Sequence, residues 1–221
     1  MAGTKQKVET KDIIPKPMLI YKIRQMDSLR DRALACFIYM SGCRISEIVG
    51  TTKIVKHYIK EKGRYVTDEN NKWIYDGFHE IEIKPLQKES IEYMEDKKVM
   101  LIHNVPCLKR LTELPKRNIP VFIPIVPEFF EIFWQYYKTL KDGGLLFPIT
   151  RERAWQILKK KMGLYSHFLI HERLTHFTSQ NDLSDQDLKL FRGWSSTVPA
   201  TSYVHLRWQD LARKQGAKLD D

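Results

Sequence analysis

The sequence predicts a mainly helical domain that carries one small antiparallel β-sheet, an α+β fold. Three observations support this prediction. Apolar residues recur at helical spacing towards both ends of the chain, β-branched residues show partial alternation in its middle, and glycines follow the helical segments. At 221 residues, of which 43% are hydrophobic and 29% charged, the chain has the size and composition of one sizeable globular domain.

The ends of the chain differ from this domain in composition. Residues 1–19 are polar, rich in lysine and interrupted by two prolines, so we expect a basic arm or linker there. We expect the domain itself to span residues 20–207. Residues 208–221 would then form a C-terminal tail.

The first two helices are expected to meet at a sharp corner. Residues 27–40 carry apolar side chains at helical spacing, and Gly42 follows as a helix-ending glycine. The stretch "RISEIVG", residues 44–50, has the character of a second helix start. Arg44 is therefore predicted to lie at the corner between two helices.

The middle of the chain, residues 51–125, is expected to hold the sheet. It contains β-branched segments with partial alternation, separated by stretches rich in turn-forming residues. The last two strands would be joined through "LTELPKR", which puts Lys109 at the end of a strand beside a hairpin.

Helical character returns after Val126. Residues 127–144 and residues 150–163 each end in glycine, as helices commonly do. Ser184 is predicted to cap a further helical segment, with Asp187 three residues on.

The net charge of +10 favours an anionic partner, with nucleic acid first and an acidic membrane surface second. No apolar run is long enough to span a membrane, and the N-terminus lacks the apolar stretch of a signal peptide, so a cytoplasmic location is expected. Cys36, Cys43 and Cys107 show no metal-binding spacing and are expected to be reduced structural thiols, with no metal site.

Two sequence boxes resemble those of the tyrosine site-specific recombinases. "SGCRISEIVG" is similar to the family's "TGxRxSEL" box, and "GWSSTVPATSYVHL" is similar to its terminal "GHSSxxxTxxYxH" box. The family includes phage integrases, Xer-type recombinases and the integrases of archaeal viruses and plasmids. The resemblance covers about residues 20–207 and implies the family's catalytic domain, without the helical core-binding domain that usually precedes it.

The resemblance also implies a chemistry and the residues that perform it. Tyr203 would attack the scissile phosphate of double-stranded DNA and form a 3′-phosphotyrosyl ester, which requires neither metal nor cofactor. Arg44 would bind the phosphate oxygens, unless it merely forms an ion pair with Glu47. Lys109 would be the general acid for the departing 5′-oxygen, with Lys116 as the alternative.

Further residues complete the implied site. Trp194 occupies the position of the family's histidine or tryptophan and can donate one hydrogen bond from its indole N–H. His167 would be the base or proton relay near the tyrosine. Arg173, Lys116 and Arg117 are expected to contact DNA.

The stretch "HFLIHERLTHF" departs from the family pattern HxxRHxxxTH at one position. His167, His171, Thr175 and His176 match the pattern, which assigns the second catalytic arginine to Ile170. Aligning Arg173 there instead would abandon the threonine and histidine matches. His171 and His176 are expected to make structural hydrogen bonds.

An isoleucine at this position leaves three explanations open: an engineered substitution, a natural loss of cleavage, or compensation by the arginine one turn away. We therefore expect a recombinase or integrase that is impaired in strand cleavage and self-associates on DNA. The alternatives are a non-catalytic DNA-binding protein that keeps the fold and a type IB topoisomerase. Whether the tyrosine acts within its own protomer or in a neighbouring one also remains open at this stage.

Overall fold

The computed structural model describes residues 13–105, 121–180 and 184–192. In these ranges the chain forms seven α-helices, seven strands and one short 3₁₀ helix, so the predicted α+β class is confirmed. The helices are α1 (Lys16–Arg24), α2 (Leu29–Ser41), α3 (Ile45–Val49), α4 (Pro127–Tyr137), α5 (Arg151–Met162), α6 (Ser166–Gln180) and α7 (Asp185–Arg192). The strands are β1 (Thr51–Tyr58), β2 (Lys60–Glu61), β3 (Arg64–Tyr65), β4 (Tyr75–Ile83), β5 (Ile91–Met94), β6 (Val99–Ile102) and β7 (Val121–Pro124).

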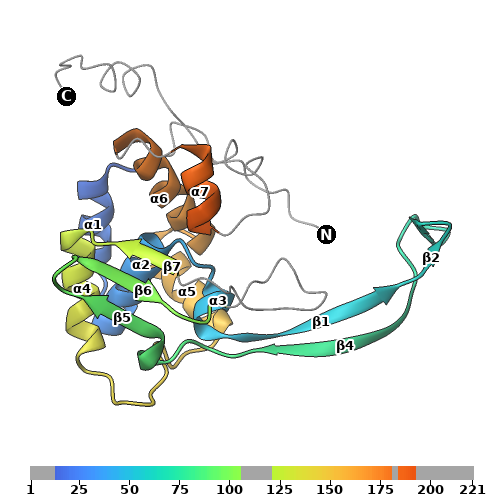
Figure 1. The fold of residues 1–221 in the computed structure, drawn as a ribbon, viewed down its shortest axis with the longest axis horizontal. Helices are drawn as coiled ribbons and strands as arrows, with labels where there is room; N and C mark the ends of the chain where they lie inside the picture. The colour runs from blue at the N-terminus through green and yellow to red at the C-terminus, as the bar shows by residue number, and fades with distance from the viewer. Residues whose placement is uncertain (1–12, 106–120, 181–183, 193–221) are drawn as a thin grey trace.

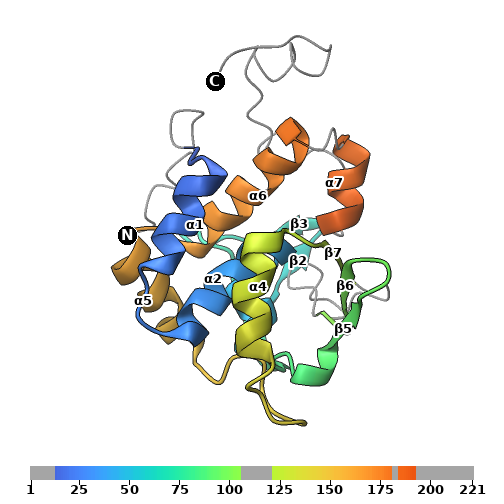
Figure 2. The ribbon, with the colours of Figure 1, turned by 90° about the vertical axis from the view of Figure 1, so that its left-hand side faces the viewer.

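Helix α2 lies at the centre of the fold. It contacts α1, α4, α5, α6 and β7, and Figure 2 shows it enclosed by other helices. Every residue from Ala33 to Ser41 is buried. Four of the apolar positions predicted from helical spacing, Ala33, Cys36, Phe37 and Met40, are among them, and the fifth, Leu29, is partly buried. The burial also extends around the helix because neighbours cover each of its sides.

Aromatic side chains fill the space between α2 and α4. The ring centroids of Phe37 and Phe133 are 5.0 Å apart, and Tyr39 stacks on Phe129 at 4.3 Å. Phe147, from the loop before α5, packs on Phe37 at 5.9 Å. Aromatic pairs at these distances stabilise a core beyond the area that they bury.

The sequence predicted one sheet, and the number of sheets in this prediction is wrong. All strand pairs are antiparallel, but the described strands form three separate sheets: β1 with β4, β2 with β3, and β5–β6–β7. The pairing of β6 with β7 is the hairpin expected from the sequence. Pro85, which has no backbone N–H to continue a ladder, follows β4, and the next residue, Leu86, donates to the carbonyl of Ile48 instead.

Strands β1 and β4 form a long ribbon that projects from the body of the protein, with β2 and β3 at its far end (Figure 1). Gly50 begins the ribbon with a φ of +74°. A Cβ atom at this position would lie 2.6 Å from the carbonyl oxygen of Ile83, so only glycine fits where the two strands leave the body.

Some element boundaries differ from their predictions. Helix α1 begins at Lys16, so the predicted limit between residues 19 and 20 falls inside a helix; Pro17 is tolerated there because the first turn needs no N–H from it. Helix α4 ends at Tyr137, well before Gly143. The backbone N–H groups of Thr139 and Leu140 donate to carbonyls three residues earlier, which replaces the helical pattern of four. Across the described ranges, no helix is both long enough and apolar enough to cross a membrane.

Candidate active site

The corner between α2 and α3 has the predicted form. Gly42 ends α2 with a φ of +62°, and Arg44 is the residue immediately before α3. The backbone N–H of Arg44 donates to Oε2 of Glu47 at 2.7 Å, and its Nη1 donates to Oε1 at 2.8 Å. Glu47 thus holds both the backbone and the side chain of Arg44 at the start of the helix.

This contact is the ion pair that the sequence offered as the alternative role of Arg44. The two roles are compatible, because a guanidinium has five N–H donors and Glu47 engages one nitrogen of it. The Glu47 side chain is buried, whereas that of Arg44 is about a quarter exposed. The buried carboxylate therefore orients the arginine and leaves its other donors available to an anion.

A pocket of about 490 Å³ opens beside this corner. It brings together Arg44, His167 and Ile170, three positions that the sequence assigned to one site although more than 120 residues separate the first from the others. The remaining lining residues come from α3, α5 and the start of α6: Ile45, Ser46, Arg151, Glu152, Trp155, Gln156 and Ser166.

Arg151 is a candidate that the sequence reasoning missed. It is the first residue of α5, directly after the capping Thr150, whose Oγ1 accepts from the N–H of Arg153. Two arginines in the first turn of a helix oppose its dipole, which favours acidic residues there. This pattern was visible in the sequence and marks a helix end suited to bind an anion, although Glu152 lines the same pocket.

Ile170 and Arg173, three residues apart on α6, have different surroundings. Ile170 is 1% exposed, belongs to the hydrophobic core and also borders the pocket. Arg173 is 3% exposed, with its guanidinium carbon 3.6 Å from the ring centre of Phe177 and 5.4 Å from that of Tyr39. Arg173 does not line the pocket, so in this conformation it cannot compensate for Ile170, and its burial conflicts with the predicted DNA contact.

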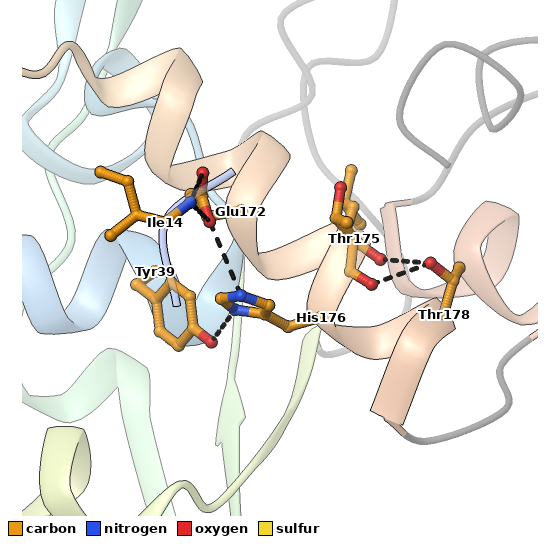
Figure 3. A network of polar contacts seen from close by, with 7 residues as sticks. Ile14, Tyr39, Glu172, Thr175, His176 and Thr178 are labelled. Atoms are coloured by element: carbon orange, nitrogen blue, oxygen red, sulfur yellow. Dashed lines mark hydrogen bonds and ion pairs between the residues drawn. The ribbon is translucent and has the colours of Figure 1, made fainter. Parts of the chain in front are cut away.

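A buried polar network fixes α6 against α2 (Figure 3). The hydroxyl of Tyr39 and Nδ1 of His176 are 2.7 Å apart, which gives His176 the structural role expected from the sequence. The Glu172 carboxylate accepts the backbone N–H of Ile14 at 3.1 and 3.2 Å and lies 3.6 Å from Nε2 of His176. Further along the helix, the Thr178 hydroxyl donates to the carbonyl of Thr175 at 2.9 Å.

Burial shifts the titration of this network. It raises the pKa of Glu172 to about 8 and lowers the pKa of His176 to about 4, in both cases chiefly because the charged form loses its hydration. Burial also raises the pKa of Tyr39 to about 12. The network is therefore held in its neutral forms near pH 7, and it positions the helix that carries His167 and Ile170.

Several predicted site residues lie outside the described ranges. They are the nucleophile Tyr203, Trp194, the general-acid candidates Lys109 and Lys116, and the DNA contact Arg117. Their roles stay predictions. Among the cysteines, Cys36 and Cys43 are buried, in keeping with structural thiols, and Cys107 falls outside the same ranges.

Comparison with known proteins finds the fold but no close relative. No known family and no curated protein matches the sequence. A XerA recombinase structure matches with a TM-score of 0.57 at 12% identity, covering 93% of this chain and 66% of that one. The Tn1549 transposon integrase in complex with circular intermediate DNA matches with a TM-score of 0.51 at 15% identity, covering 98% of this chain and 66% of that one.

The chain therefore has the fold that the sequence resemblance implied, shared with a recombinase and an integrase. It spans just under two thirds of the length of these two chains.

Replacement of Glu172 by glutamine should flatten the pH dependence of stability. With a pKa of about 8 against an ordinary 4.5, folded Glu172 keeps a proton that the unfolded chain releases, so stability falls as pH rises towards 8. His176, with its pKa lowered from 6.5 to about 4, opposes this trend only below pH 6.5. Between pH 6.5 and pH 8, the free energy of unfolding of the native chain should therefore drop by about 2 kcal/mol.

Urea unfolding at several pH values measures this drop. We expect Glu172→Gln to keep the contact with Ile14 and lose the decline, whereas Glu131→Gln, at an exposed position on α4, should retain it. An unchanged decline in Glu172→Gln would show that Glu172 is ionised in the folded protein.

Proposed function

We propose that the protein binds double-stranded DNA and cuts and rejoins it through a tyrosine, as a site-specific recombinase or integrase. The observation that supports this proposal is the convergence of Arg44, His167 and Ile170 on one pocket, from helices far apart in the sequence. The fold shared with a recombinase and with an integrase bound to DNA is consistent with it. The +10 charge supplies the attraction for a polyanion.

In this proposal the pocket holds the scissile phosphate. The Tyr203 oxygen attacks phosphorus, the bond to the 5′-oxygen breaks, and Lys109 gives that oxygen its proton, while His167 relays the proton of the tyrosine. Rejoining reverses these steps, because the phosphotyrosyl ester keeps the energy of the broken bond. The transition state carries extra negative charge on the non-bridging oxygens, which preorganised donors stabilise.

Arg44 and Arg151 are the proposed donors to those oxygens. Glu47 fixes the direction of Arg44, so its remaining N–H groups need little reorganisation to bind a phosphate. Arg151 adds a second positive charge to the pocket lining, at the N-terminal end of α5. Its position is the reason to propose it as a partial substitute for the arginine missing at 170.

A non-catalytic DNA-binding protein is the second candidate, and Ile170 is the observation that favours it. An apolar side chain forms the pocket wall where the family has an arginine. Loss of one preorganised donor typically costs about 10² to 10³ in rate. The same pocket would then bind a phosphate without cutting it efficiently.

The proposal includes partners and setting. We expect the protein to self-associate on DNA, to need no small-molecule cofactor and to act in the cytoplasm. The family resemblance suggests a mobile element, such as a virus or plasmid of an archaeal host, as its source.

A covalent protein–DNA adduct on a nicked suicide substrate tests the chemistry. The native chain should form the adduct, and Tyr203→Phe should abolish it while changing DNA affinity by no more than about tenfold, since one hydroxyl contributes roughly 0.5–1.5 kcal/mol. Tyr21→Phe, at an exposed tyrosine of α1, is the matched control and should behave as the native chain does. An adduct that survives Tyr203→Phe would exclude this tyrosine as the nucleophile.

Ile170→Arg should raise adduct formation by about 10²-fold or more, the effect of regaining one transition-state donor. Because Ile170 borders the pocket, the arginine stem can remain in the core while its guanidinium reaches into the pocket. Ile170→Met, of similar volume and without charge, is the control. A stably folded Ile170→Arg variant with no gain in adduct would contradict the assignment of position 170.

Arg151→Ala should weaken DNA binding and reduce its salt dependence. A phosphate contact by Arg151 contributes a log–log slope of about −0.9, so the native slope of several units should become shallower by that amount. Lys159→Ala changes an exposed lysine of the same helix outside the pocket and should leave the affinity closer to native. Titration of a labelled duplex across salt concentrations measures both; an unchanged slope in Arg151→Ala would remove Arg151 from the phosphate site.

A further inference from the structure

The β1–β4 ribbon exposes an apolar face that the protein itself does not cover. Residues directly opposite each other in the ladder share a face, and one face carries the pairs Thr52–Glu82, Ile54–Glu80, Lys56–Phe78 and Tyr58–Tyr75. Ile54 is 55% exposed and Phe78 62%, more than any other large apolar side chain of the ribbon. The Lys56 ammonium lies 4.0 Å over the ring of Tyr75.

A two-stranded ribbon of this kind is only marginally stable when no other element covers it. Its eight-residue first strand is about 27 Å long, and the sheet has no third strand in the described structure. Isolated two-stranded hairpins are marginally stable in water, and long edges with exposed apolar side chains invite pairing. The face is therefore expected to be covered by a partner when the protein works.

The charge of the ribbon argues against DNA as that partner. Residues 51–83 contain six basic and six acidic residues, so the ribbon has no net charge and the whole +10 of the chain lies outside it. Glu80 and Glu82 lie on the apolar face and would be repelled by phosphates. The outgoing half, residues 51–65, is basic, whereas the returning half, residues 66–83, is acidic.

The apolar face is instead complementary to itself. Along the ribbon, Glu82 and Glu80 lie towards the body and Lys56 lies towards the far end. Ile54 is directly opposite Glu80 and Phe78 is directly opposite Lys56, so these two apolar residues occupy neighbouring diagonal positions. If two such faces pack with their ribbons antiparallel, the lysine of each comes near the glutamates of the other, with the apolar side chains at the centre. Such a two-fold arrangement uses the same patch on both copies.

We propose that this face, formed by Ile54, Lys56, Phe78 and Glu80 together with the Tyr58–Tyr75 pair, is a surface through which two copies of the chain associate. The inference rests on the self-association that the proposed function includes, and it assigns that association to the ribbon. One ribbon face is smaller than a standard protein interface, so the contact is weak in free solution. It strengthens when two copies are held on one duplex, because their effective concentration rises.

Sedimentation velocity tests this assignment, with the protein alone over a range of concentrations and with a duplex long enough for two copies. The native chain should dimerise, and Phe78→Lys should weaken dimerisation by about tenfold or more, the effect of a central interface residue. Phe122→Lys is the matched control, because Phe122 is 51% exposed on β7, away from the ribbon. Affinity for a duplex too short for a second copy should be the same in all three proteins.

A charge exchange guards against a variant that merely unfolds the ribbon. Lys56→Glu and Glu80→Lys should each weaken dimerisation, and the double variant should restore it, because the complementary charges are then present in reversed positions. If the native chain dimerises and Phe78→Lys dimerises equally, the ribbon is not the interface although self-association stands. A native chain that stays monomeric on the long duplex would overturn both the self-association and its assignment to the ribbon. A Phe78→Lys variant that loses affinity for the short duplex would show that the ribbon contacts DNA instead.

Discussion

The burial of α2 from Ala33 to Ser41 is the constraint on which the rest of the structure depends. A helix covered on all sides must have neighbours in every direction, and α1, α4, α5 and α6 supply them. Because α2 cannot continue past the core, the chain turns at Gly42, and the next helix begins at the surface beside α5 and α6. The position of Arg44 at the pocket is thus a consequence of core packing.

Two buried carboxylates serve the site in different ways. Glu47 accepts from both the backbone and the side chain of Arg44, so its charge is compensated and directs a cation. Glu172 accepts only a backbone N–H at hydrogen-bonding distance, and burial raises its pKa to about 8. The first is suited to orient a phosphate ligand, whereas the second is suited to hold a helix in place without adding charge near it.

Local sequence features predicted what depends on neighbours along the chain. Gly42 and the periodicity before it predicted the corner at Arg44, and the serine and aspartate at the start of α7 predicted its cap, in which the Asp187 N–H donates to Ser184 Oγ at 3.2 Å. These patterns are short in range, so the sequence alone contains them. The assignment of His167 and Ile170 to one site with Arg44 was instead implied by the family resemblance, and all three residues line one pocket.

Tertiary placement was beyond the same reasoning. Alternating residues of β4 give the same pattern in a sheet within the body and in a free ribbon, so the projection of β1 and β4 was not foreseen. Arg173 has the charge of a DNA contact, and only the packing of Tyr39 and Phe177 around it shows that it is buried. The arginines at the start of α5 were visible in the sequence, but only the structure shows that this helix begins at the pocket, where Arg151 lies beside Arg44 in the lining.

If the protein binds DNA as proposed, the separation of charge between body and ribbon has a consequence for that encounter. A long-range field acts on net charge, so a duplex attracts the body of the protein and exerts almost no net pull on residues 51–83. The resulting torque turns the basic surface towards the duplex before any contact forms. The ribbon, which has no net charge, would then point away from the polyanion, so the field would favour one orientation of the molecule before contact.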